Sequence, residues 1–342
     1  MKIIFFVFAV LALNSCISAP GYIGNNSDHY DGTYFKNRTK MANNSRWDIF
    51  KYVVSTPFKN EKWPEWIEEA YNELPKNIDP EHLNVTFINH ATVLIRHQGQ
   101  AILTDPVFAK RASPFSWLGP KRVRNPGIKK EDLPELNVIL ISHNHYDHLD
   151  IESLKWLYKN KGEPLILVGL GVGELLKEND IHNFIEMDWN DKFEESGTSY
   201  YFLECRHRSG RGLSDQMKTL WGSFAILIGK YKIYFAGDSG YDLHFKEAGE
   251  KFNGFDLSLL PIGAYEPRWF MKDPHVNPEE AVQAHLDLKS KLSMGIHFGT
   301  FQLTYEKIDD PLKDLNIALS KRGLSDKDFI APTFGQNLEI PF

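Results

Sequence analysis

The sequence has few cysteines, no excess of positive charge and no long apolar run. Cys16 and Cys205 are its only cysteines, so no intramolecular disulfide forms if one of them is modified. The 39 basic and 45 acidic side chains give a net charge of -6. Because nucleic-acid binding normally needs a basic stripe, we expect no nucleic-acid partner. With 42% hydrophobic and 25% charged residues, the composition is that of a globular protein.

The N-terminal residues indicate a targeting signal rather than a structural element of the folded protein. The apolar run Ile3–Leu13 has 11 residues, whereas a membrane-spanning helix needs about 20. It ends in Leu13-Asn14-Ser15-Cys16, which resembles the lipobox of bacterial lipoproteins. We therefore interpret residues 1–15 as a signal peptide and Cys16 as a lipid anchor. The residue after the cysteine is Ile17 and not an acidic retention signal, so we expect the mature protein at the outer membrane, on its periplasmic or its surface face. An ordinary cleaved signal peptide with an incidental cysteine is the alternative.

Two segments precede the main domain. Residues 16–46 are polar and show no apolar periodicity, which predicts a flexible tether. Residues 47–83 are aromatic, with Trp63 and Trp66 among them, and predict an N-terminal extension packed on the main domain, or alternatively a flap that faces the membrane. Residues 84–342 show no internal repeat and no further break in composition, so we expect one large domain.

Strands and helices alternate from Asn84 onward. Asn137–Ile141 (NVILI) is a nearly continuous apolar run, which predicts a buried strand. Asp150 is expected to cap a helix at Ile151–Asn160, and Asn277–Glu280 has the cap, the proline and the acids of a helix start. Further strands are expected at 85–88, 92–96, 101–104, 164–168, 200–203, 224–228, 232–236 and 293–296, and a second helix at 174–178. This pattern predicts a domain with helices outside two sheets.

The strongest chemical signal directly follows the NVILI strand. His143–His148 reads HNHYDH and places three imidazoles and the Asp147 carboxylate within six residues. Imidazole and carboxylate together suit zinc and similar divalent ions, and burying so many titratable groups without a metal would be costly. His143 and His145, two residues apart, can bind one ion, and Asp147 with His148 can bind a second.

Three later residues also follow predicted strands. They are His207, Asp238 in the turn Gly237–Gly240, and His297. A single histidine at a strand end is more often structural than functional. Because these three stand in this order after the histidine-rich loop, we predict that they complete the metal centre.

This order of residues resembles the metallo-β-lactamase superfamily, whose fold is a four-layered αβ/βα sandwich. Over residues 84–332 the sequence is similar to the N-acyl-phosphatidylethanolamine-hydrolysing phospholipase D family and its bacterial relatives. The segments that carry this resemblance are Leu103–Arg124, Ile141–Asp150, Phe235–Tyr241, Pro261–Met271, His275–Ala281 and Ile296–Phe301.

The resemblance implies a metal-dependent phosphodiesterase with two Zn²⁺ or other divalent ions. It implies that one ion is held by His143, His145 and His207, the other by Asp147, His148 and His297, and that Asp238 bridges them. A hydroxide shared by the ions would then attack phosphorus and release an N-acylethanolamine and a phosphatidic acid from a phospholipid at a membrane surface. A lactonase or esterase on the same fold, and a non-catalytic metal-binding lipoprotein, are the alternatives. The sequence is compatible with either a monomer or a homodimer.

Five further residues are candidates around the metals. Arg211 is a candidate partner of a phosphate, Tyr146 of a substrate oxygen, and His275 of the substrate or of a transferred proton. Asp105 and His90 are expected to orient metal ligands from behind. A purely structural role is the alternative for each of the five.

Two other motifs are weaker. Gly169–Gly173 (GLGVG) follows a strand as in dinucleotide-binding proteins, but Glu174 stands at the third glycine position and would repel a pyrophosphate, so we expect only a tight turn. Lys121–Arg124 (KRVR) is expected to be a solvated basic loop, with lipid headgroups as the alternative partner. Ser116-Trp117 and Phe334–Gln336 depart from the phospholipase pattern, which leaves acyl and headgroup selectivity open.

Overall fold

The computed structural model of the chain describes residues 18–41, 51, 62–212 and 214–341. It contains two seven-stranded sheets. In spatial order, the first sheet has strands β14 (Asn337–Ile340), β1 (Leu83–Asn89), β2 (Thr92–His97), β3 (Gln100–Thr104), β4 (Val138–Leu140), β5 (Leu165–Gly169) and β6 (Phe184–Met187). The second sheet has β13 (Phe329–Ile330), β12 (Ser290–Ile296), β11 (Phe255–Pro261), β10 (Tyr231–Phe235), β9 (Ser223–Ile228), β8 (Thr198–Leu203) and β7 (Lys192–Glu195).

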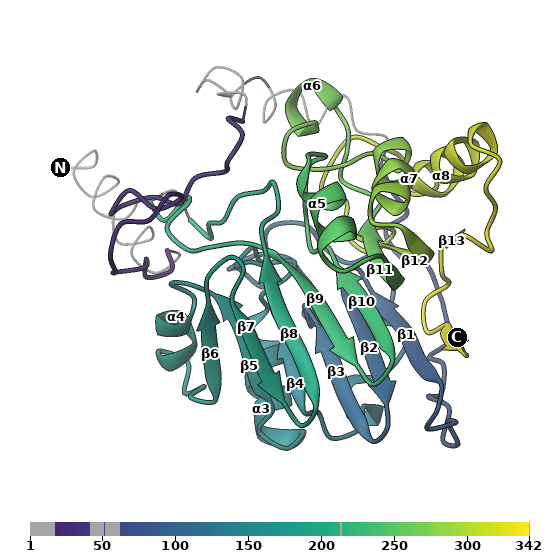
Figure 1. The fold of residues 1–342 in the computed structure, drawn as a ribbon, viewed down its shortest axis with the longest axis horizontal. Helices are drawn as coiled ribbons and strands as arrows, with labels where there is room; N and C mark the ends of the chain where they lie inside the picture. The colour runs from purple at the N-terminus through teal and green to yellow at the C-terminus, as the bar shows by residue number, and fades with distance from the viewer. Residues whose placement is uncertain (1–17, 42–50, 52–61, 213, 342) are drawn as a thin grey trace.

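Helices cover the outer faces of the two sheets (Figure 1). The helices are α3 (Ile151–Asn160), α4 (Gly173–Lys177), α5 (His244–Lys251), α6 (Arg268–Met271), α7 (Pro278–Asp287) and α8 (Asp310–Lys321), with a 3-10 turn η1 at Lys130–Asp132. Helix α7 packs on β11 and β12, and α5 and α8 pack on α7. The expected four-layered sandwich with helices outside two sheets is confirmed.

The NVILI strand shows why the sheets are buried on both faces. Val138 and Leu140 belong to the core that includes residues of both sheets. Ile139 and Ile141 alternate with them and pack in a second cluster with α3. Because successive strand residues point to opposite faces, a strand covered on both sides must be apolar throughout.

The structure confirms the predicted helices, with one correction at a cap. Asn277 caps α7 in a full capping box with Glu280. Asp150 stands before α3 but its side chain does not cap it. The Asp150 carboxylate instead accepts the backbone N–H groups of Phe108 and Ala109, at 3.3 and 2.9 Å. The backbone of the loop that follows β3 therefore uses the carboxylate that was predicted to cap α3.

Residues 18–41, which belong to the predicted flexible tether, make contacts with the main domain in the structure. Tyr30 and Phe35 are buried in the core, with ring centroids 4.6 Å apart. Backbone hydrogen bonds join Tyr22 to Lys218 and Phe35 to Met217. The segment is polar on average, but its few aromatic side chains find partners that are distant in sequence, and this burial orders it.

Part of the predicted N-terminal extension lies within the described residues. Residues 62–82 lie against the main domain, where the Trp63 indole donates to the Glu306 carbonyl and the Ile67 amide to the Val123 carbonyl. The predicted signal peptide, Cys16 and most of residues 47–61 lie outside the described residues. In the part of the chain that the structure describes, no helix is both long and apolar enough to cross a membrane.

The GLGVG segment forms the predicted tight turn between β5 and α4. Gly171 has a φ of +86°, and a Cβ there would lie 2.8 Å from the Tyr22 nitrogen. Only glycine fits both requirements. The turn therefore serves packing against the N-terminal segment.

Candidate metal centre

The topology brings the candidate ligands together. Strands β1 and β4 run in the same direction in the first sheet, as do β8, β10 and β12 in the second. Contacts between the residues that follow these strands, such as the His297 amide with the His90 carbonyl, show that the carboxyl ends of both sheets lie at one edge of the sandwich. The residues that follow these five ends include His90, His143, His207, Asp238 and His297.

The first group of ligands comprises His143, His145 and His207. His145 Nδ1 lies 2.8 Å from His143 Nε2 and 3.3 Å from His207 Nε2, and all three rings have a nitrogen within 4.8 Å of the others. Burial holds the pKa of His143 and of His145 well below the usual value and lowers the pKa of His207 to about 4. The three imidazoles are therefore neutral near pH 7, which is the form that binds a metal.

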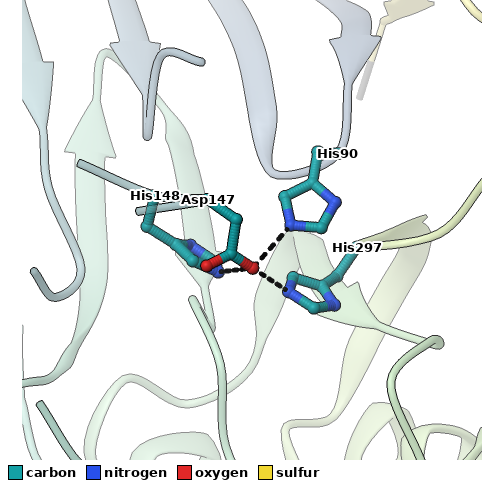
Figure 2. A group of neighbouring side chains, drawn as sticks. All are labelled: His90, Asp147, His148 and His297. Carbon is teal, nitrogen blue, oxygen red and sulfur yellow. Dashed lines mark hydrogen bonds and ion pairs between the residues drawn. The ribbon is translucent and has the colours of Figure 1, made fainter. Parts of the chain in front are cut away.

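The second group comprises Asp147, His148 and His297, and His90 joins it (Figure 2). Asp147 Oδ2 lies 3.1 Å from His90 Nε2, 3.3 Å from His297 Nε2 and 3.6 Å from His148 Nε2. His90 was expected behind the ligands, yet its Nε2 points at the same carboxylate as theirs. It is thus close enough to be a ligand or a direct partner of one.

Asp238 lies between the two groups. Its Oδ2 is 3.2 Å from both His148 Nε2 and His297 Nε2, and 3.8 Å from His207 Nε2. Within the described residues, Asp238 Oδ1 and His148 Nε2 are buried with no hydrogen-bond partner. Buried polar atoms are normally paired, so these converging nitrogen and oxygen atoms fit a divalent cation of the zinc type.

A layer of hydrogen bonds behind the ligands fixes their orientation. Asp105 Oδ2 accepts from His148 Nδ1 and from the Ser142 hydroxyl, each at 2.6 Å, and Asp105 Oδ1 accepts the Ser142 amide at 2.8 Å. His207 Nδ1 lies 2.9 Å from the Pro274 carbonyl. Pairing of Nδ1 leaves Nε2 to face the metal position, so Asp105 is placed for the role predicted from the sequence.

The three candidate substrate residues occupy different positions. Arg211 lies over the Tyr146 ring, with its guanidinium carbon 3.8 Å from the ring centroid. One of its nitrogens, Nη1, donates to the carbonyls of Asn144 and Leu149, at 2.9 and 2.7 Å, so Arg211 braces the histidine-rich loop. His275 Nδ1 lies 3.8 Å from Asp238 Oδ2, which places its imidazole beside the metal centre.

Asn37 is a member of the site that the sequence did not indicate. Its side-chain oxygen accepts the His207 amide at 3.1 Å, and its side-chain nitrogen donates to the His207 carbonyl at 2.8 Å. Nothing in the polar segment around Asn37 distinguishes it from its neighbours. Only the fold reveals that this segment reaches a candidate ligand.

A cavity of about 740 Å³ adjoins the histidine-rich loop. Tyr146 and Arg211 line one part of it, and the loop 109–116 and the residues Ser18 and Ala19 line others. The seven predicted ligands do not line this cavity. It is therefore a neighbour of the metal centre and not the centre itself.

Comparisons with known proteins identify relatives of the chain. A model described as the β-lactamase superfamily domain matches residues 100–298. The chain is 40% identical over 268 residues to N-acyl-phosphatidylethanolamine-hydrolyzing phospholipase D 1 of Caenorhabditis elegans, covering 74% of this chain and 75% of that protein. It is 41% identical over 99 residues to the outer membrane protein RomA of Klebsiella pneumoniae, covering 29% of this chain and 73% of RomA.

A solved structure supports the same fold. Igni18, a metallo hydrolase from the hyperthermophilic archaeon Ignicoccus hospitalis, superposes with a TM-score of 0.58 at 17% sequence identity, covering 76% of this chain and 99% of that one. At this identity the likeness concerns the fold alone.

Proposed function

The chain belongs to the metallo-β-lactamase superfamily and is related within it to the N-acyl-phosphatidylethanolamine-hydrolysing phospholipases D, and from this premise we propose that it is a phosphodiesterase of that specificity. That it is a metal-dependent hydrolase follows from the family and from the histidine and aspartate groups together. The proposed reaction cleaves an N-acylated phosphatidylethanolamine into an N-acylethanolamine and a phosphatidic acid. The observation that carries this specificity is the 40% identity to the nematode phospholipase across three quarters of the chain.

We further propose two Zn²⁺ ions as the cofactor. His143, His145 and His207 would hold one ion, and Asp147, His148 and His297 the other. The position of Asp238 Oδ2, 3.2 Å from two histidines of one group and 3.8 Å from one of the other, supports a bridging role. Ions bound there would supply an activated water and stabilise negative charge on phosphate oxygens.

The chain's own residues have the following proposed tasks. Asp105 keeps His148 in the tautomer that presents Nε2, and Arg211 keeps the histidine-rich loop in shape through its two carbonyl contacts. His275 is half-buried beside Asp238, with its carbonyl held by Arg268 at 2.8 Å. From there it is placed to pass a proton to the leaving alkoxide or to bind a phosphate oxygen. Tyr146, next in sequence to His145, is the second candidate contact for the substrate.

We place the enzyme at the outer membrane, anchored through Cys16. The lipobox-like sequence and the partial similarity to an outer membrane protein support this location. An anchored enzyme would meet its phospholipid substrate at the bilayer surface. The proposal is compatible with a monomer or a homodimer.

The test is a parallel assay on two substrates. The full chain, loaded with zinc, is incubated with vesicles containing N-acylphosphatidylethanolamine and separately with an acyl-homoserine lactone, and products are identified by mass spectrometry. We expect N-acylethanolamine and phosphatidic acid from the first, with neither formed by Asp147→Ala. Lactone opening without phospholipid cleavage would instead assign the lactonase reaction to the same metal centre.

A further inference from the structure

An exposed apolar tip lies on the loop between β3 and β4. Trp117 is 71% exposed and its neighbour Leu118 is 53% exposed. Removing apolar area from water stabilises a protein, so two adjacent large apolar side chains in solvent indicate a surface that meets a partner. We call residues 111–121 the tip loop.

The tip loop is a built structure and not a loose connection. The backbones of Arg111 and Lys121 form an antiparallel β-bridge across its base. The Ala112 amide donates to the Pro120 carbonyl at 3.0 Å. The Arg111 guanidinium donates to the carbonyls of Ser116 and Gly119, which lie on either side of the tip. Trp117 and Leu118 are therefore held outward by hydrogen bonds within the loop.

Gly119 makes this tight shape possible. It has a φ of +97°, and a Cβ at this position would lie 2.6 Å from the Ser113 Cβ. A side chain there would disturb the loop. The backbone thus favours the conformation that exposes the two preceding residues.

The charges at the base of the tip loop suit an anionic surface. Lys110 and Lys121 are exposed. Arg122, by contrast, is buried and donates to the carbonyls of Val107 and Ala109, and Arg124 pairs with Glu69. Only part of the KRVR segment is thus a solvated basic loop. Lys110 and Lys121 are therefore available to bind anionic lipid headgroups. They flank Trp117, and tryptophan is enriched at membrane interfaces.

The tip loop lines the 740 Å³ cavity described above together with the histidine-rich loop and the N-terminal segment. Ser113 and Phe115 of the loop line the 740 Å³ cavity together with Tyr146 of the histidine-rich loop. Ser18 and Ala19, where the described chain begins, line it as well, and the Ala19 amide is tied to Asp215 at 2.7 Å.

We propose that Trp117 and Leu118 insert into the interfacial layer of a phospholipid bilayer, with Lys110 and Lys121 on its anionic headgroups. Because the tip loop and Tyr146 line one cavity, this docking would bring the histidine-rich loop beside the bilayer. This docking rests on the exposed side chains and their surroundings, and it is independent of which bond the metal centre cleaves.

The experiment measures the fluorescence of a label on the tip loop. Membrane attachment through the N-terminus alone would therefore not give a positive result. The full chain carries Ser116→Cys labelled with the fluorophore NBD, and a matched control carries the label at Ile317→Cys on α8, which is also exposed. Cys205 is buried. Labelling of the unsubstituted chain, which keeps Cys16 and Cys205, gives the background signal of the label. The vesicles contain phosphatidylethanolamine, phosphatidylglycerol and a doxyl-labelled quencher lipid, with no N-acylated lipid.

We expect a blue shift and strong quenching at position 116 and neither at 317. Adding Trp117→Ser and Leu118→Ser to the labelled Ser116→Cys chain should weaken the quenching about tenfold or more, because both apolar anchors are lost. Equal quenching at 116 and 317 would overturn the proposal. So would a blue shift at 116 that depends on protein concentration without vesicles, since the tip would then cover a second copy of the chain.

Discussion

The side-chain amide of Asn37 holds the backbone of His207 at both its N–H and its C=O. The two residues are 170 positions apart in sequence. His207 also has its Nδ1 fixed by the Pro274 carbonyl, so the candidate ligand is held at both its backbone and its ring. The N-terminal segment is thus part of the support of the metal centre.

Replacing Asn37 should therefore weaken metal binding. We expect Asn37→Ala to lower zinc affinity about tenfold, at the lower end of the effect seen when groups that orient metal ligands are removed. Zinc affinity is measured by competition with a chelating dye. Lys36→Ala, which removes an exposed neighbour whose ammonium pairs with Asp31, should leave affinity unchanged. Equal affinities for both variants would show that Asn37 has no part in the site.

Asp105 should matter for metal binding although it is not one of the seven predicted ligands. In Asp105→Asn the carboxylate that accepts from His148 and Ser142 becomes an amide of the same shape. We expect zinc affinity to fall about 10- to 100-fold, since His148 loses the partner that fixes its tautomer. The exposed Asp180→Asn serves as a control for loss of charge. An unchanged affinity with two bound ions would contradict this role.

His275 should contribute to turnover and not to metal retention. His275→Asn is expected to keep both ions and to lower kcat about 100-fold, as for the loss of a general acid. His275 also lies near His207 and Asp238 in a group that could hold an ion. Loss of one ion, measured by elemental analysis, would therefore make it a ligand instead.

Removing the metals should make stability depend on pH. Although burial lowers the pKa of His297, attraction to Asp238 and Asp147 outweighs it and raises that pKa to about 9. The unfolded value is about 6.5, so protonated His297 stabilises the metal-free fold fully below pH 6.5, and this contribution disappears as the pH rises through about 9. The pKa of His148 is raised as well, since attraction to Asp238 and Asp147 exceeds the effect of burial.

The measurement is the melting temperature of chelator-treated and zinc-loaded protein between pH 6.5 and 9.5. The metal-free form should lose several degrees over this range, corresponding to on the order of 3 kcal/mol. The loaded form should lose less, because bound metal already keeps these imidazoles deprotonated. Parallel curves for the two forms would show that these histidines do not titrate as described.

Sequence patterns predicted those parts of the fold in which the signal is local. Three examples are the NVILI strand, the capping box at Asn277 and the loop His143–His148. The sequence signal for each of them lies within a few neighbouring residues. Strand β11 was not predicted, although it lies between β10 and β12, because Asp256 and Ser258 interrupt its apolar pattern. Its burial depends on two neighbouring strands that are remote in sequence.

The candidate site divides in the same way. The seven predicted ligands follow strands or stand in one loop, so their meeting at one edge could be inferred from the pattern and the family resemblance. Asn37 could not, because its importance arises from Tyr30 and Phe35 fixing a polar segment on the domain. The supporting role predicted for His90 fits its 3.1 Å contact with the Asp147 carboxylate, but the sequence could not show that His90 comes as close to that carboxylate as the predicted ligands do.

Hydrolysis in ¹⁸O-labelled water tests the central claim most directly. The zinc-loaded chain is given N-acylphosphatidylethanolamine vesicles, and both products are weighed by mass spectrometry, with Asp238→Asn as the metal-centre control. We predict one ¹⁸O atom in the phosphatidic acid and none in the N-acylethanolamine, because activated water attacks phosphorus, and no product above background from Asp238→Asn. Label in the N-acylethanolamine, or equal product from Asp238→Asn, would contradict the account.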